Sequence, residues 1–341
     1  MKTNPWLRLG ITAGAVLFVF AAAVTYRFLE SHGVFTAVEP GFAGTCRAVA
    51  GIAGPGDIAV DAPGKTAFVS AKDGIYAYAY DVPGAHLVKL EGTPKDFHPG
   101  GIGLYRSPDG GLTLIAINRQ GDGSYAIDVF AAEGKKLQLI GSIGSDVLVD
   151  PSDLAVVDED RFYVVNAHTS RTVLGRWLDD VLLLPRANVL FFDGMKFVTA
   201  AEELNSPRGV AANGQRLFVA EQYPRTLLAF ERDSFSGRLK EAGAFPIASG
   251  LDRIDIAPDG SLWIAGQPKA FAMNAFHLNP KKPAPSQVFR VDLEGGTPHA
   301  FSLVYANGGD EIGGAGVAAR AGDHLLIGSE QGGKMLDCGL P

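Results

Sequence analysis

Charged side chains recur at the start of a short repeated phrase in this sequence. Three of them are carboxylates, at Asp57, Asp153 and Asp252. Two are guanidinium groups, at Arg208 and Arg253. Carboxylates suit a hard cation such as Ca²⁺, and paired guanidinium groups suit a carboxylate, a phosphate or an oxyanion. The alternative is a structural network of ion pairs between repeats, because buried charges need partners.

The phrase that carries these residues is an apolar alternating run, a turn, and a run of β-branched and aromatic residues. Each copy predicts two strands joined by a tight turn. The copies are roughly 45 to 60 residues apart, which suits one four-stranded blade each. Six such units predict an all-β, six-bladed β-propeller, in which the first strand of every blade lines one central channel. The residues that open the copies should therefore meet at one mouth of the channel. The copies start at Gly56, Gly100, Ser152, Arg208, Asp252 and Ala315.

The composition agrees with many short strands joined by turns. The chain has 341 residues, of which 43 are Gly, 20 are Pro and only 20% are charged. The formal net charge is −7. This acidic balance, with no basic run, excludes nucleic acid as the expected partner.

The first 27 residues form a separate element. Lys2 and Arg8 precede an apolar stretch over residues 9–24, and Arg27 follows it. The pattern predicts a signal sequence, with residues 21–23 as a cleavage site, or a retained signal anchor. The stretch is short for a span of about 20 residues, so both alternatives stay open. Either way we expect an exported protein, periplasmic or otherwise extracytoplasmic, and in contact with the membrane if the segment is retained.

The rest of the chain divides into a linker over residues 28–45 and a propeller over residues 46–341. Residues 171–184 break the strand pattern, with apolar side chains at helical spacing. This predicts one short helix after the third repeat, either as a lid over the channel mouth or packed on the side of the propeller. Residues 269–285 contain several Pro and Asn residues and are predicted to form a long surface loop.

Two cysteines are present, and they lie at opposite ends of the predicted propeller. Cys46 precedes the first repeat and Cys338 lies near the C-terminus. In an exported protein this pair predicts a disulfide that ties the first strand to the last. Closing so long a loop stabilises the fold by about 5 kcal/mol in the chain-entropy account. The alternative is two free buried thiols.

Several segments together resemble the paraoxonase/arylesterase family. The resemblance covers roughly residues 46–338 and includes the position of the cysteine pair. It implies a calcium-dependent six-bladed propeller that hydrolyses lactones and esters. The broader gluconolactonase-like superfamily shares the propeller but usually lacks the cysteine pair. The segments that carry the resemblance are residues 45–47, 97–102, 150–156, 162–168 and 305–328.

The resemblance implies one retained calcium site. In the family a buried structural ion is held by two aspartates and a backbone carbonyl. Asp57, Asp153 and the carbonyl of Ile102 fall at those positions. The expected cofactor is therefore a single structural Ca²⁺.

A second, catalytic ion of the family is not expected here. Its glutamate position is Gly56, and its asparagine positions are Ser152, Arg208 and Arg253, so that Asp252 alone is retained. A calcium ion does not lie beside two guanidinium groups, because like charges repel. One of these guanidinium groups, or both, is expected to occupy the space of the missing cation.

The family's histidine dyad is also absent. Gly100 and Arg119 stand at its positions, whereas His168 matches another active-site histidine. His168 is therefore the candidate acid or base.

Two functions remain open from the sequence. The first is a divergent hydrolase of an ester or lactone that works without the catalytic calcium. In it Arg208 and Arg253 bind a substrate carboxylate or an oxyanion, Asp252 orients them, and Ser152 contributes to substrate binding. The second is a non-catalytic exported propeller that recognises an anionic small molecule or partner. A general base near the arginines distinguishes the two, and the sequence offers only Asp252 and His168 as catalytic candidates for it.

Overall fold

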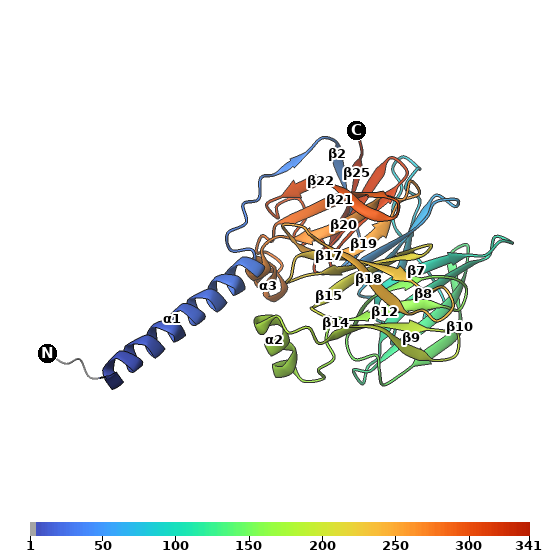
Figure 1. The fold of residues 1–341 in the computed structure, drawn as a ribbon. Coiled ribbons are helices and arrows are strands. Elements are labelled where there is room, and N and C mark those ends of the chain that lie inside the picture. The colour runs from blue at the N-terminus through green and yellow to red at the C-terminus, as the bar shows by residue number, and fades with distance from the viewer. Residues whose placement is uncertain (1–4) are drawn as a thin grey trace.

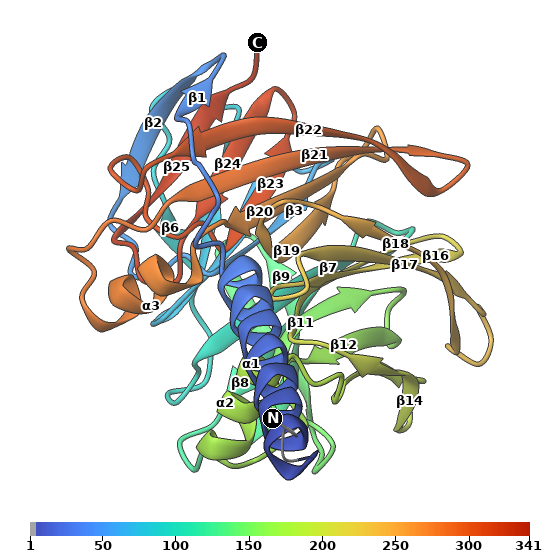
Figure 2. The ribbon, with the colours of Figure 1, turned by 60° about the vertical axis from the view of Figure 1, so that its left-hand side comes forward.

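The computed structural model describes residues 5–341, which form six antiparallel sheets around a central channel (Figures 1 and 2). Each sheet has four strands, except that one gains a fifth from the short strand β1. The predicted six-bladed β-propeller is therefore confirmed. Within a blade, the first strand lies innermost and each later strand pairs antiparallel with the one before it.

The first three blades follow one another along the chain without interruption. Blade one contains β3 (Asp57–Asp61), β4 (Thr66–Ala71), β5 (Gly74–Tyr78) and β6 (Val88–Lys89). Blade two contains β7 (Pro99–Arg106), β8 (Leu112–Arg119), β9 (Tyr125–Glu133) and β10 (Lys136–Gly144). Blade three contains β11 (Pro151–Val156), β12 (Phe162–Asn166), β13 (Ala187–Phe192) and β14 (Phe197–Leu204).

The last three blades include the strands that close the ring. Blade four contains β15 (Pro207–Asn213), β16 (Arg216–Glu221), β17 (Thr226–Arg232) and β18 (Leu239–Pro246). Blade five contains β19 (Gly250–Ile256), β20 (Leu262–Gln267), β21 (Ser286–Glu294) and β22 (Thr297–Asn307), with β1 (Gly41–Phe42) at its edge. Blade six contains β23 (Val317–Ala321), β24 (His324–Gly328), β25 (Lys334–Gly339) and the N-terminal β2 (Thr45–Ala50).

The hydrophobic core lies between neighbouring blades. The second strand of each blade is apolar on both faces and almost wholly buried, as in β12 and β20. Such continuous runs of β-branched and aromatic residues are typical of strands covered on both sides. Between blades one and six, for example, Tyr78 and Val69 belong to the same buried cluster as Leu326. These contacts fix the angles between blades and so the width of the channel.

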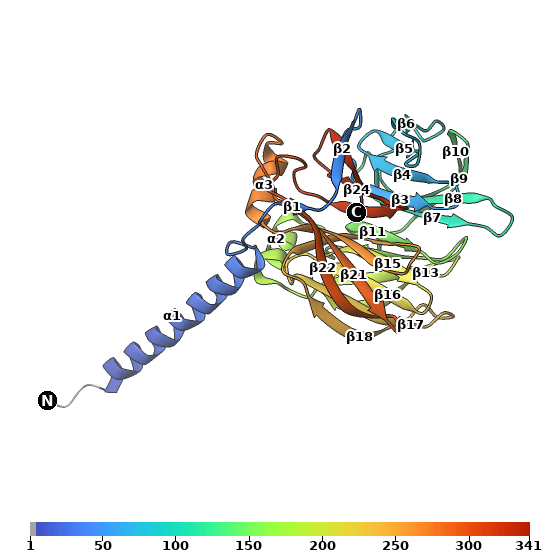
Figure 3. The same ribbon diagram turned by 90° about the horizontal axis from the view of Figure 1, so that it is seen from above.

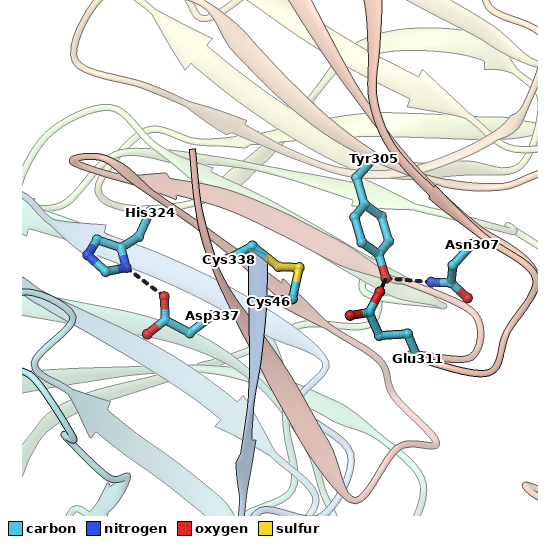
Figure 4. The surroundings of a disulfide bond; sticks show 7 residues. All are labelled: Cys46, Tyr305, Asn307, Glu311, His324, Asp337 and Cys338. Atoms are coloured by element: carbon cyan, nitrogen blue, oxygen red, sulfur yellow. Dashed lines mark hydrogen bonds and ion pairs between the residues drawn. A yellow bond between two sulfur atoms is a disulfide. The ribbon is translucent and has the colours of Figure 1, made fainter. Parts of the chain in front are cut away.

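The ring is closed by the predicted disulfide between Cys46 and Cys338. The two residues face each other across β2 and β25, with their Cα atoms 3.9 Å apart (Figure 4). Next to it the buried carboxylate of Asp337 accepts hydrogen bonds from Tyr78 of blade one, at 2.5 Å, and from Arg47. Its other oxygen lies 2.6 Å from Nδ1 of His324. The disulfide therefore joins the N-terminal strand to the C-terminal strand within blade six, and the hydrogen bond of Asp337 with Tyr78 joins that blade to blade one.

The N-terminal helix α1 (Pro5–Ser31) extends from the propeller into solvent (Figures 1 and 3). In the described part of the chain it is the one helix long and apolar enough to cross a membrane, over Ile11–Ser31. Among its described side chains, those at its C-terminal end touch the body: Phe28 packs on Phe271. Directly after the helix, the buried His32 stacks on Tyr223 and Phe271, with ring centroids 4.8 and 5.4 Å away. An exposed apolar helix together with a disulfide is typical of an exported or membrane-anchored protein.

Two short helices lie at the end of the propeller that faces α1. The helix predicted after the third repeat is α2 (Val173–Leu182), whose N-cap residue Thr172 accepts a hydrogen bond from the backbone N–H of Gly175. The prediction of a loop over residues 269–285 is wrong in its first half, which forms α3 (Ala270–Leu278). That half is rich in Ala and apolar residues, whereas the Pro residues all follow it, at Pro280, Pro283 and Pro285.

Candidate functional site

Two rings of residues meet at the mouth of the channel. One ring opens the first strands, as predicted. The other closes the second strands, because antiparallel pairing places the end of each second strand beside the start of the first: Pro151 faces Asn166 and Gly250 faces Gln267. The mouth contains a cavity of about 930 Å³. The charged and polar residues that line it include Asp150, Ser152, Arg208, Asp252, Arg253 and Glu330.

Arg253 lies at the centre of the channel and binds groups from several blades. Its side chain is only 7% exposed. Nη1 lies 2.9 Å from Oε1 of Glu330 and 3.6 Å from Oδ1 of Asp252. Nε lies 3.6 Å from Oδ1 of Asp57, and Nη2 donates to the carbonyl of Ser152 at 3.4 Å. Although burial opposes its charge, these carboxylates raise the pKa of Arg253 above its usual range. Its guanidinium group is therefore a permanent, internally paired cation.

Arg208 lines the same cavity but is not paired. Within residues 5–341 no hydrogen bond or ion pair involves its guanidinium group, although Asp252 and Glu330 are near enough to raise its pKa against the effect of burial. Both arginines were predicted to bind substrate. The structure gives them different surroundings, and Arg208 is the one whose donors are available to a ligand.

Asp57 and Asp153 lie below Arg253 and are buried. Asp57 accepts hydrogen bonds from the backbone N–H groups of Ile58 and Ile102, at 2.9 and 2.7 Å. Asp153 accepts one from Val210 at 2.9 Å. Burial raises the pKa of both carboxyl groups, and for Asp153 the charge of Asp57 raises it further. The two carboxylates therefore repel each other, and the positive charge of Arg253 interacts favourably with both.

This lower pair fits a bound cation in charge and in chemistry. Two buried carboxylates share one guanidinium group, and hard oxygen ligands suit Ca²⁺. No group of three or more His, Cys, Asp or Glu side chains is arranged to hold a metal in the part of the chain described. An ion between Asp57 and Asp153 would therefore depend on backbone oxygens, such as the predicted carbonyl of Ile102, to complete its ligands.

The upper end of the channel does not fit a second calcium ion. The guanidinium group of Arg253 already lies against Asp252, Glu330 and the Ser152 carbonyl. Position 56, where the resemblance places the family's glutamate ligand, is glycine, and a Cβ atom there would lie 3.3 Å from Cγ of Glu330. A carboxylate is therefore present near this position, but it comes from blade six and is paired with an arginine.

Asp252 is buried between the two rings. Its Oδ2 accepts a hydrogen bond from Nε2 of Gln267 at 2.8 Å. Burial raises the pKa of Asp252 to about 6, against the opposing effects of Arg253 and Arg208. The hydroxyl group of Ser152 donates to the carbonyl of Pro207 at 3.0 Å, so it joins blades three and four at the wall of the cavity.

His168 connects α2 to the mouth through two carboxylates. Its Nδ1 lies 2.7 Å from Oδ2 of Asp150, and its Nε2 lies 2.9 Å from Oδ1 of Asp180 on α2. Arg176 of α2 binds the other oxygen of Asp150 at 2.8 Å. Burial alone would lower the pKa of His168, but the two carboxylates raise it to about 9. The ring is therefore a cation at neutral pH, which suits a proton donor better than a base.

Of the ring that closes the second strands, sequence reasoning found His168 and missed Glu330 and Gln267. These two side chains bind Arg253 and Asp252. The signal was present, because each repeated phrase ends at its second strand. Aligning the copies on their last residues as well as their first would have found these positions.

Known proteins resemble this chain in sequence and fold. The profile of a family described as Arylesterase matches residues 46–340. Mechanosensory abnormality protein 6 of Caenorhabditis elegans is 27% identical over 254 residues, covering 72% of this chain and 67% of that protein. Serum paraoxonase/arylesterase 2 of Homo sapiens is 24% identical over 308 residues, covering 83% and 86%. The solved structure of regucalcin, a calcium-binding protein of Agrobacterium tumefaciens, aligns with a TM-score of 0.55 at 14% identity, covering 88% and 94%, which shows a shared fold.

Proposed function

The chain belongs to the arylesterase family, and we propose that it hydrolyses a carboxylic ester or lactone that carries a negative charge. The observation that carries the proposal is Arg208, an unpaired guanidinium group in a cavity of about 930 Å³. A guanidinium group binds a carboxylate through two parallel hydrogen bonds. The same group stabilises an oxyanion that develops on a carbonyl under attack.

The proposed reaction uses no calcium ion at the upper end of the channel. Arg253 supplies a fixed positive charge there, and it holds Asp252 and Glu330 in place. Asp252 in turn orients the two arginines through its charge. His168, protonated at neutral pH, is the candidate proton donor at the edge of the mouth. Ser152 borders the space for the substrate.

A single calcium ion between Asp57 and Asp153 belongs to the same proposal. Bound there, with the Ile102 carbonyl, it would supply positive charge to two buried carboxylates and so stabilise the channel. We also infer an exported location, periplasmic or otherwise extracytoplasmic, in which α1 anchors the protein if it is retained.

The rival function is an exported binding propeller without catalysis. It is supported by His168, whose two ring nitrogens are both occupied by carboxylates. The same unpaired Arg208 would then bind an anionic small molecule or partner that is not turned over.

The experiment compares carboxylated esters and lactones with their neutral methyl esters, using the full chain in detergent. The parent should hydrolyse the carboxylated compounds preferentially. Arg208→Gln should lower kcat/KM for these compounds about tenfold to a hundredfold, the value of one charge-assisted contact, and leave neutral compounds unchanged. Arg238→Gln, an exposed arginine at the far end of blade four, is the control. If the parent binds these compounds without turning them over, the rival function is favoured. If it shows no binding and no turnover, both functions are rejected.

A further inference from the structure

Glu330 presents a carboxylate oxygen to the cavity. It follows β24 in blade six and projects between the first strands of blades one and six, where Cβ atoms on Gly56 and Gly316 would lie 3.3 and 3.7 Å from its Cγ. The two glycines therefore leave the space that this side chain occupies. Its Oε1 accepts a hydrogen bond from Arg253, whereas no described residue is hydrogen bonded to Oε2. The side chain is 41% exposed, so water in the cavity reaches it.

The other acidic groups at the mouth are less available to a water molecule. Asp252 is 5% exposed, and its Oδ2 is bound to Gln267. Asp150 uses one oxygen for His168 and the other for Arg176. Among the described carboxylates that line this cavity, Glu330 therefore combines a free oxygen with access to solvent.

Arg253 also keeps Glu330 ionised. Although burial opposes its charge, Arg253 and Arg208 lower the pKa of Glu330 below the usual glutamate value. A carboxylate that stays charged in mild acid is present in its basic form over a wide pH range. The ion pair fixes Oε1, and thereby the direction in which Oε2 points.

We propose that Glu330 is the general base that activates water, an inference that rests on the proposed ester or lactone hydrolysis. Oε2 takes a proton from a cavity water as the water oxygen forms a bond to the carbonyl carbon. The carbonyl π electrons move to its oxygen, which Arg208 stabilises. When the carbonyl re-forms, the bond to the leaving oxygen breaks, and the proton on Glu330 passes to that oxygen. The products are an acid and an alcohol, or one hydroxy acid from a lactone, and no further reactant is needed.

The first measurement is the kinetics of Glu330→Gln on whichever ester or lactone the parent hydrolyses. We expect kcat to fall about a hundredfold to ten-thousandfold, the usual contribution of a general base, with little change in KM. Asp323→Asn, an exposed carboxylate in the hairpin at the opposite end of blade six, should leave kcat unchanged. A Glu330→Gln variant that keeps parental kcat would overturn the proposal.

The second measurement separates Glu330 from Asp252 and from a purely structural role. In the pH profile of parent kcat/KM, the apparent pKa at which activity falls in acid should lie below the usual glutamate pKa. An apparent pKa near 6 would assign the base to Asp252. Glu330→Ala should regain activity with added formate, which restores a carboxylate to the empty space. If Glu330→Gln does not fold, this variant and the parent profile decide the question. Failure of formate to rescue a folded, inactive Glu330→Ala would contradict the proposal. A parent without turnover would overturn the proposed function, and with it this inference.

Discussion

Arg208 and Arg253 open neighbouring blades, yet their guanidinium groups have opposite surroundings. Arg253 is enclosed by the carboxylates of Glu330, Asp252 and Asp57. Arg208 faces the cavity with no ion pair to any described residue. A cation that is covalently tethered does not dissociate, so the carboxylates of the upper channel remain compensated without a metal. In the proposed function, the second arginine is then the one that recognises a ligand.

Replacing Arg253 should therefore affect stability more than any surface arginine does. Arg253→Ala leaves buried carboxylates without their cation, which destabilises a protein by about 3–5 kcal/mol. Urea denaturation should show this loss, with Arg238→Ala changing the free energy of unfolding by less than about 0.5 kcal/mol. Equal free energies of unfolding for the two variants would show that Arg253 is not the internal cation of the channel.

His168 should stabilise the fold in a pH-dependent way. Its folded-state pKa is raised from 6.5 to about 9. A raised pKa contributes stability that is complete below pH 6.5 and is lost as the pH rises through 9, so the contribution at pH 7 is about 2–3 kcal/mol. His168→Gln should lower the melting temperature most at pH 6 and least at pH 10. A decrease in melting temperature that is the same at every pH would mean that the His168 ring is neutral in the folded protein.

At the scale of elements, α2 is held to the mouth by polar contacts and leaves its apolar side chains in solvent. Asp180 and Arg176 bind His168 and Asp150, while Trp177 is 56% exposed. The helix is thus tied to the rim of the channel, and α1 and α2 lie on the same face of the propeller (Figure 2).

Two truncations test how α1 contributes to the fold. Removing residues 1–26 should release the protein from the membrane fraction and change its melting temperature by less than about 2 °C, because the contacts are made by the last turn. Removing residues 1–36 also deletes His32, which packs on Tyr223 and Phe271 and whose carbonyl accepts a hydrogen bond from Ala270. This variant should melt several degrees lower. Equal melting temperatures would show that the docked turn does not stabilise the propeller.

The repeats allowed the blades and the first ring of site residues to be predicted, because strand period and turn residues are local signals. The pairing of Arg253 with Glu330 was not predicted, since it joins blades five and six and depends on the width of the channel. The helix α3 was missed because the three Pro residues after Leu278 outweighed a short apolar run. The disulfide was predicted from the compartment and from the positions of Cys46 and Cys338.

At the scale of the whole molecule, the channel carries more buried acid than base. Burial raises the pKa of Asp57, Asp153, Asp252 and Asp255, the last two to about 6 and about 7. Arg253 compensates only part of this charge. The closed ring holds these groups together, because the disulfide and the Asp337 contacts prevent the blades from separating (Figure 4).

The metal-free protein should therefore be most stable in mild acid. A carboxyl group whose folded pKa is raised above its unfolded value near 4 loses stability as the pH rises between the two, here from about pH 4 to about pH 7. Carboxyl groups with lowered pKa values, such as Asp150, are already ionised in both states above pH 5 and do not change this trend. Burial lowers the pKa of His32 and His277 from 6.5, so these two groups oppose the trend only below pH 6.5. With chelator, the melting temperature should fall from pH 5.5 to pH 8, and added Ca²⁺ at pH 8 should restore it. A melting temperature that changes with neither pH nor Ca²⁺ would contradict the proposed calcium site between Asp57 and Asp153.

We infer that Arg253, a tethered cation, takes the place of the catalytic metal in this arylesterase-family propeller. The most direct test is the hydrolysis rate of a carboxylated lactone or ester as free Ca²⁺ is lowered by chelator, at a temperature where circular dichroism shows the fold to be intact. We expect kcat/KM to stay within about twofold of its value in Ca²⁺, since the one calcium ion proposed, between Asp57 and Asp153, would contribute only to stability. Loss of turnover in a protein that remains folded, with recovery on adding Ca²⁺, would contradict it.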